Sequence, residues 1–243
     1  MKRICVLGLP RTGSNYILSM LFNNLDDIVP KDEHFLSLSE PFTWQQPFLP
    51  VLGPDGFIEN IEKADTFQSN GERIEYVIDV ISRADRSQSL VLKLFPLDLV
   101  DGLVDRIIAA LKSANFTFIQ VKRNNIEHQL ISYALAEKTN RWLSSDGTYM
   151  DERHMITSFA SMTWLYKNIV EFDSKLIRND MEPPTIHYET AIADLSSYLN
   201  VHVDQVITNS FLEKQGAEDP YKCIINAGEI RWYFEKLLDK EPV

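Results

Sequence analysis

Cysteine is scarce in this chain, and so are long apolar runs and any excess of positive charge. Only two of the 243 residues are cysteines, Cys5 and Cys223, which excludes a disulfide framework and a cysteine-based zinc site. Lys and Arg number 24 against 35 Asp and Glu, a formal net charge of -11, which argues against binding to nucleic acid. No stretch approaches the roughly 18 apolar residues of a membrane-spanning helix. We therefore expect no stable membrane insertion.

The amino-terminal segment begins like a secretory signal, with Met1-Lys2-Arg3 followed by the apolar residues 4–7. The apolar run ends at Pro10-Arg11, which is too early for such a signal. We therefore expect a cytoplasmic protein. The length and the hydrophobic content of 44% suit a single domain over residues 1–243, and we find no internal repeat.

Strand-like and helix-like patterns alternate along the chain. Short apolar or β-branched runs predict strands at 4–7, 89–96, 116–121 and 183–189. Helical spacing of apolar residues predicts helices that start at 16 and at 126, and others over 58–83, 103–111, 151–178, 191–199 and 229–238. The proline-containing stretch 44–56 predicts an irregular loop. Such alternation favours an α/β fold, a parallel sheet with helices on both faces.

A turn with two glycines and a proline lies between the first strand and the first helix. Gly8 and Gly13 have the spacing of a nucleotide phosphate loop, G-x-x-x-x-G. In that motif Lys and then Ser or Thr would follow, but Ser14 and Asn15 stand here, so the groups that reach ATP phosphates and magnesium are missing. Unpartnered N–H groups and the dipole at a helix start favour anions. We expect a phosphate or sulfate group here, with Arg11 supplying positive charge.

The hexapeptide Pro10-Arg11-Thr12-Gly13-Ser14-Asn15 resembles the 5′-phosphosulfate loop of sulfotransferases, whose pattern is roughly P-[KR]-[ST]-G-[ST]-[TN]. These enzymes transfer a sulfuryl group from 3′-phosphoadenosine 5′-phosphosulfate (PAPS) to an acceptor hydroxyl, and they use no metal. The resemblance implies a P-loop-like parallel sheet and a co-substrate site built from Arg11, Thr12, Gly13, Ser14 and Asn15. It also implies that Arg11 stabilises charge during the transfer.

Two further residues resemble catalytic groups of the trehalose sulfotransferases, the family members closest in pattern. Glu40, in a Glu-Pro pair, resembles the proposed general base of that family; a solvated loop carboxylate is the alternative. Lys93 interrupts an apolar strand, where a lysine is costly unless it meets an anion. The resemblance assigns Lys93 to the transferring sulfuryl group, and a lysine that reaches water from the strand end is the alternative.

A second strand–loop–helix carries the counterpart of a 3′-phosphate site. In sulfotransferases an arginine after a strand and a serine eight residues later bind the 3′-phosphate, whereas Arg123 and Ser132 are nine residues apart here. Either Arg123 reaches the phosphate or Lys122 shares the task; the alternative is that Arg123 and Ser132 are ordinary surface residues. Asn124 or Asn125 is expected to cap the helix that follows.

The carboxyl-terminal part adds two points of resemblance. Tyr188-Glu189 matches a pair that ties a strand end to its neighbours in sulfotransferases, and Lys222 lies in a loop that covers the adenine and the 3′-phosphate in these enzymes. The resulting interpretation is a PAPS-dependent sulfotransferase that acts on a hydroxyl of a carbohydrate, a glycolipid or a small metabolite, as a monomer or a homodimer. A phosphate-loop kinase or NTPase, and a catalytically inactive nucleotide-binding module of the same fold, are the alternatives.

Overall fold

In the described part of the chain, five parallel strands form one sheet in the order β2-β5-β1-β6-β7. The strands are β1 (Arg3–Leu7), β2 (Ile28–Val29), β5 (Ser89–Leu94), β6 (Thr117–Lys122) and β7 (Thr185–His187). The computed structural model describes residues 3–24, 28–29, 48–52, 58–62, 72, 75, 78–79, 89–94, 103–139, 153–206 and 220–238. The predicted α/β fold with a parallel sheet is confirmed in these residues.

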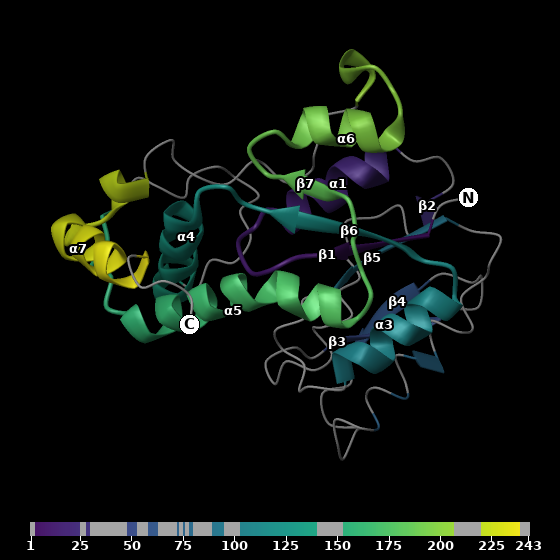
Figure 1. Ribbon diagram of the computed structural model, residues 1–243, viewed down its shortest axis with the longest axis horizontal. Coiled ribbons are helices and arrows are strands. Elements are labelled where there is room, and N and C mark those ends of the chain that lie inside the picture. The colour runs from purple at the N-terminus through teal and green to yellow at the C-terminus, as the bar shows by residue number, and fades with distance from the viewer. Residues whose placement is uncertain are drawn as a thin grey trace.

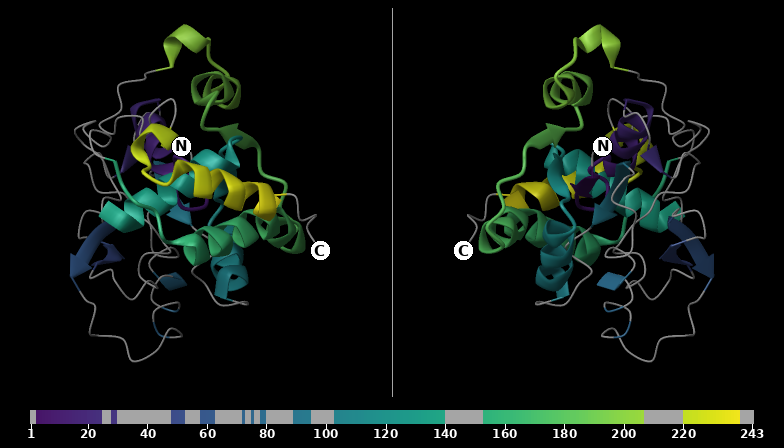
Figure 2. Two further views of the ribbon diagram at one scale, coloured as in Figure 1. Left: turned by 90° about the vertical axis from the view of Figure 1, so that its left-hand side faces the viewer. Right: turned by 90° about the vertical axis from the view of Figure 1, so that its right-hand side faces the viewer.

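Helices cover both faces of this sheet (Figure 1). Helices α1 (Ser14–Asn24) and α6 (Ala191–Leu199) pack on one face, and α3 (Leu103–Ser113) and α5 (Phe159–Arg178) on the other. Beyond the carboxyl ends of the strands, three elements pack together: α4 (Ile126–Thr139), η3 (Pro220–Cys223) and α7 (Ala227–Leu238) (Figures 1 and 2). A short 3₁₀ turn, η2 (Val203–Gln205), follows α6. No helix in the described ranges is long and apolar enough to cross a membrane.

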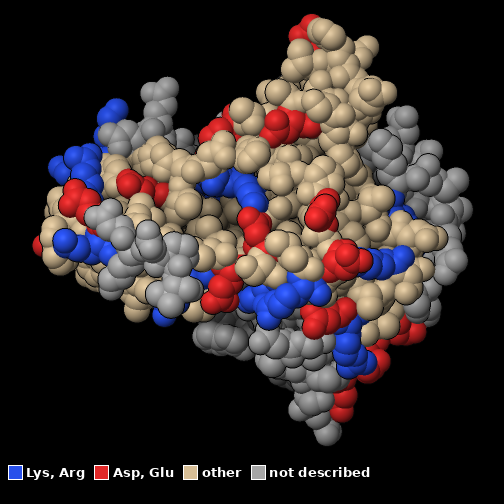
Figure 3. Space-filling view, in the orientation of Figure 1, with Lys and Arg blue, Asp and Glu red and all other residues tan. Residues whose placement is uncertain are grey.

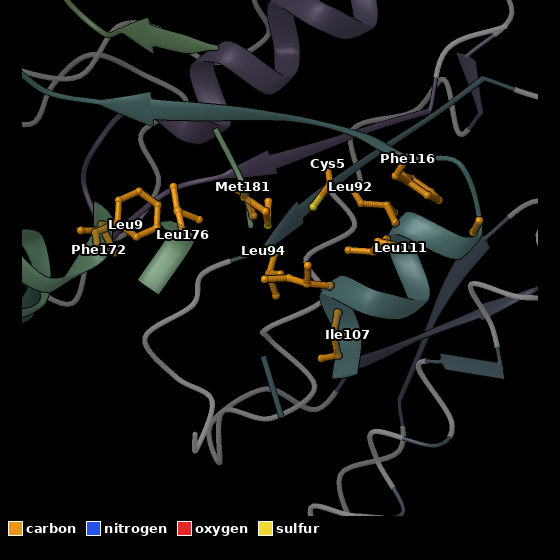
Figure 4. Close-up of a cluster of buried hydrophobic side chains, with 13 residues drawn as sticks. Cys5, Leu9, Leu92, Leu94, Ile107, Leu111, Phe116, Phe172, Leu176 and Met181 are labelled. Atoms are coloured by element: carbon orange, nitrogen blue, oxygen red, sulfur yellow. The ribbon is translucent and has the colours of Figure 1, made fainter. Parts of the chain in front are cut away.

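The alternation of strand side chains divides the core into two layers. In β1, Ile4 and Val6 face α1 and α6, while Cys5 and Leu7 face α3 and α5. Figure 4 shows the layer on the side of α3 and α5, in which Leu9 from the loop after β1 packs beside side chains of α5. Burial of both faces explains why the central strands are almost continuously apolar in sequence. Burial also raises the pKa of the Cys5 thiol, as expected for a core residue.

The topology makes the end of β1 a place where a ligand is expected. β1 lies in the centre of the sheet between β5 and β6. The chain leaves β1 through α1 on one face, and the next helix after β5, α3, lies on the opposite face. Where neighbouring parallel strands send their connections to opposite faces, the carboxyl ends border the usual ligand site of an α/β sheet.

The stretch around residues 44–62 differs from its prediction. Phe48–Leu52 forms β3 and Ile58–Glu62 forms β4, and the two strands pair antiparallel. The irregular loop predicted over 44–56 and the helix predicted from residue 58 are therefore wrong for these residues. Pairing between two nearby segments satisfies backbone N–H and C=O groups, and it overrides the local helical spacing of apolar side chains.

The helix predicted over 151–178 begins only at Phe159, as α5. The residues before it pair with the segment that precedes α7. His154 forms a parallel bridge with Ile224, and the Ile156 N–H donates to the Asn226 side-chain oxygen at 3.0 Å. These partners are about 70 residues away, so local periodicity could not reveal them.

Candidate anion-binding site

The loop of residues 8–13 between β1 and α1, here called the β1–α1 loop, alternates in backbone conformation. Arg11 and Gly13 have positive φ values of 65° and 86°, whereas Thr12 and Ser14 do not. Such alternation is typical of anion-binding nests, in which backbone N–H groups line one concave side, although the Thr12 N–H is already used within the loop. The Ile17 N–H donates to the Gly13 carbonyl at 3.0 Å, and this hydrogen bond begins the helical ladder of α1. The N–H groups before it lie at the helix start, the end that favours anions. This geometry suits a phosphate or sulfate group.

Internal hydrogen bonds shape the β1–α1 loop. The Thr12 N–H and hydroxyl both donate to the Leu9 carbonyl, at 3.2 and 2.9 Å. The Gly8 N–H donates to the Leu94 carbonyl at 3.2 Å and continues the β1–β5 pairing into the loop. Thr12, predicted as a co-substrate ligand, is buried with both donors used inside the loop. We therefore assign Thr12 to the shape of the loop.

Gly13 is required by two separate features of the structure. Its φ of 86° is rarely adopted by residues with a Cβ atom. A Cβ at this position would lie 2.2 Å from Cδ2 of the Tyr188 ring, which is buried and packs edge-on against Tyr16 with a centroid distance of 6.0 Å. The Tyr188 N–H donates to the Lys122 carbonyl at 2.9 Å, which is the kind of strand-end tie expected from the Tyr-Glu pair. Burial raises the pKa of Tyr188 to about 12, so its hydroxyl stays neutral at neutral pH.

Helix α4 contacts the β1–α1 loop through two polar side chains. The Arg11 Nε donates to Ser132 Oγ at 2.9 Å, and the Gln129 Nε2 donates to the Pro10 carbonyl at 2.9 Å. The structure thus brings together two predicted site residues, Arg11 and Ser132, from distant parts of the chain. Sequence reasoning missed Gln129; the available signal was a glutamine beside apolar residues in the predicted helix.

Lys93 connects β5 to the start of α1. It is only 3% exposed, and its Nζ donates to Asn15 Oδ1 at 3.0 Å. In the sheet it pairs in register with Val6 of β1. The buried ammonium therefore points toward the helix start rather than toward solvent.

Arg123 follows β6, and its side chain is 9% exposed. Its guanidinium carbon lies 5.0 Å from the centroid of the Tyr188 ring, and its Nε lies 4.0 Å from Glu189 Oε1. Within the described part of the chain, this Nε is buried without a hydrogen-bond partner. Burial lowers the pKa of Arg123 from its high ordinary value, while an arginine remains charged in proteins. A buried guanidinium with an unused donor suits an additional anion.

The carboxylate of Glu189 occupies the start of α4. It accepts hydrogen bonds from the Asn124 and Asn125 N–H groups at 3.1 and 3.3 Å. Burial raises the pKa of Glu189, but backbone hydrogen bonds and the charge of Arg123 outweigh this effect, and the pKa lies below its ordinary value. Asn125 caps the helix as predicted, because its Oδ1 accepts from the His128 N–H at 2.9 Å. The two N–H groups just before α4 are thus engaged by an acid of the chain.

The other predicted residues lie elsewhere. The Lys122 ammonium pairs with Asp173 of α5 at 2.6 Å, on the face of the sheet opposite to Arg123. Lys122 therefore does not share the task of Arg123. Lys222 is exposed on η3, and its contact with a nucleotide stays a prediction. Glu40 lies outside the described residues, so its role as a general base also stays a prediction.

A hollow of about 540 Å³ lies apart from the β1–α1 loop. Its walls come from the start of α5 and from α7: Phe159, Gly228, Glu229, Trp232 and Tyr233. Acidic and basic side chains are interspersed on the face of the molecule shown in Figure 3. In the ranges with described positions, no three His, Cys, Asp or Glu side chains gather as a metal site. The loop, and not this hollow, is where the predicted residues meet.

Comparison with known proteins does not assign this chain to a family. The sequence matches no model of a known protein family, and no curated protein is significantly similar to it. Functional interpretation therefore depends on the residues and the geometry described above.

Proposed function

We propose that this protein is a sulfotransferase that moves a sulfuryl group from PAPS to an acceptor hydroxyl. The acceptor class is a carbohydrate, a glycolipid or a small metabolite. The proposal is supported by the sequence of the β1–α1 loop, by its nest-like backbone, and by two cationic side chains, Arg11 within the loop and Lys93 beside it.

The contact between Lys93 and Asn15 is the observation that carries this proposal. Asn15 stands where a phosphate-loop NTPase has the Ser or Thr that binds magnesium. Its side-chain oxygen accepts a hydrogen bond from the Lys93 ammonium at 3.0 Å. A fixed positive charge of the chain therefore lies beside the position at which an NTPase holds its metal. This favours transfer of an anionic group without magnesium over a kinase or an NTPase.

The proposed reaction is a direct displacement at sulfur. The acceptor oxygen forms a bond to sulfur while the bond from sulfur to the bridging oxygen breaks, and 3′-phosphoadenosine 5′-phosphate (PAP) leaves. Negative charge grows on the bridging oxygen, and Arg11, Lys93 and the amides of Ser14 and Asn15 would stabilise it. The acceptor proton would pass to the carboxylate of Glu40.

The 3′-phosphate is assigned to the side chain of Arg123. Its buried guanidinium has an unused Nε donor, and Glu189 accepts from the Asn124 and Asn125 N–H groups just before α4. Ser132 contacts Arg11 instead, so we place it at the 5′ end of the nucleotide.

Calorimetry with PAP tests the proposal directly. We expect PAP to bind with equal affinity in the presence of magnesium and of a chelator, and we expect ATP with magnesium to bind far more weakly. Tight binding of magnesium-ATP without binding of PAP would favour the kinase or NTPase instead. PAP binding without sulfuryl transfer to any acceptor in a screen would indicate an inactive nucleotide-binding module.

Substitution of Glu40 by glutamine is expected to lower kcat by roughly a hundredfold, because the variant cannot accept the acceptor proton. Affinity for PAP should stay unchanged, since the group acts on the acceptor. The measurement is a steady-state transfer assay combined with calorimetry. Glu182→Gln, which changes an exposed acid before β7, is the matched control and should keep full activity. Full activity of Glu40→Gln would remove Glu40 from the mechanism.

A further inference from the structure

Gln129 is a buried polar side chain on α4 that reaches the backbone of the β1–α1 loop. It is 2% exposed, and its Nε2 donates to the Pro10 carbonyl at 2.9 Å. Three residues later on the same helix, Ser132 Oγ accepts from the Arg11 Nε at 2.9 Å. Residues three apart on a helix lie on the same side. One side of α4 therefore holds both the peptide before Arg11 and the side chain of Arg11.

The Pro10 carbonyl belongs to the peptide that ends at the Arg11 nitrogen. A peptide unit is planar, and its C=O and N–H point in opposite directions when it is trans. A hydrogen bond that fixes this carbonyl against α4 therefore also fixes the direction of the Arg11 N–H, away from α4. The same plane is the reference for the φ of Arg11, which is 65°.

A left-handed backbone at a non-glycine residue is strained, so the surrounding structure must hold it in place. If the peptide between Pro10 and Arg11 rotated, Arg11 could return to a negative φ, and its guanidinium would leave Ser132. The alternation of positive φ at positions 11 and 13 would then be lost, and the nest with it.

We propose that Gln129 is a positioning residue for the anion site. Its side-chain amide holds the peptide between Pro10 and Arg11 in the orientation that keeps the β1–α1 loop competent to bind an anion. The identity of that anion, the 5′ end of PAPS, rests on the proposed function. The effect on the loop backbone is independent of it.

The test compares Gln129→Met with Gln120→Met in the full-length protein. Methionine keeps the length of the side chain and removes the amide donor. Gln120 is a matched control because it is also buried, 4% exposed, and also loses one donor, to Asp173 at 2.7 Å on the other face of the sheet. Gln120 also accepts a hydrogen bond from the Thr185 hydroxyl at 3.3 Å, so the control should lose at least as much stability in thermal unfolding as Gln129→Met.

Two measurements separate positioning from general destabilisation. For Gln129→Met we expect amide hydrogen exchange in a peptide covering residues 8–13 to accelerate about tenfold or more, and PAP affinity to fall about tenfold or more. With PAPS and an acceptor, KM for PAPS should rise while kcat at saturation changes less than about threefold, because binding energy can restore the loop. Gln120→Met should change neither exchange at 8–13 nor PAP affinity.

The outcomes are distinct. Equal loss of PAP affinity in both variants, or unchanged affinity in Gln129→Met, would overturn the inference. If the wild-type protein binds no PAP, the proposed function fails. The exchange measurement then still decides whether Gln129 holds the loop, and unchanged exchange in Gln129→Met would overturn that role.

Discussion

Substitution of Gly13 by alanine is expected to abolish detectable PAP binding and to lower the melting temperature by roughly 10 °C. The new Cβ would lie 2.2 Å from the Tyr188 ring, and alanine would have to adopt a φ of 86°. Left-handed strain and overpacking in a filled core together cost about 2–5 kcal/mol. Differential scanning calorimetry and titration with PAP measure the two effects.

Gly228→Ala is the matched control for this substitution. Gly228 lies in α7, and a Cβ added there would have no heavy atom within 4 Å. Alanine favours a helix over glycine by up to about 1 kcal/mol, so this variant should be as stable as the wild type or more stable. In a Tyr188→Ala background the steric part of the Gly13→Ala cost should disappear and the φ part should remain. A Gly13→Ala protein with wild-type stability and PAP affinity would contradict the packing described for the loop.

Substitution of Arg11 by glycine is expected to lower kcat/KM for sulfuryl transfer by roughly a thousandfold. The variant removes the positive charge and the hydrogen bond to Ser132, while glycine adopts a φ of 65° without strain. Relief of the strained backbone offsets the lost hydrogen bond and the greater entropy of glycine in the unfolded chain, so thermal stability should change by less than about 1 kcal/mol. Loss of activity without loss of stability is the signature of a functional residue held in a strained conformation.

Asn200→Gly serves as the control for the backbone effect. Asn200 has a φ of 57° at the carboxyl end of α6, and it is exposed. The substitution relieves a similar conformation without touching the β1–α1 loop, so activity should not change. Comparable activity of Arg11→Gly and the wild type would show that the side chain of Arg11 has no part in the reaction.

Sequence reasoning was most successful where local pattern decides structure. The apolar run of β1, the β-branched run of β6 and the periodic spacing in α6 each predict an element that the structure contains. In each of these segments the regular spacing of apolar residues matches the face that is buried. The spacing therefore indicates both the type of secondary structure and its place in the chain. The glycine at position 13 was also informative, because only a residue without a Cβ suits the turn that the structure has there.

Contacts between distant segments could not be predicted from the sequence. Helix α4 buries residues around most of its circumference, so its periodicity did not reveal which side faces the β1–α1 loop or that Gln129 binds the Pro10 carbonyl. Likewise, the sequence predicted a phosphate at the start of α4, but not that Glu189 accepts from the Asn124 and Asn125 N–H groups just before this helix. The positive φ of Arg11 could not be foreseen, because no local signal marks a strained arginine.

The order in which the chain is synthesised has a consequence for this site. The β1–α1 loop leaves the ribosome early, yet Lys93, Gln129 and Tyr188, which border it, are translated much later. A nascent chain that stops before Tyr188 has the glycine-containing segment without the aromatic ring that packs on it. If this loop binds a nucleotide as proposed, a chain that ends before Tyr188 would have the binding loop without the residues that support it.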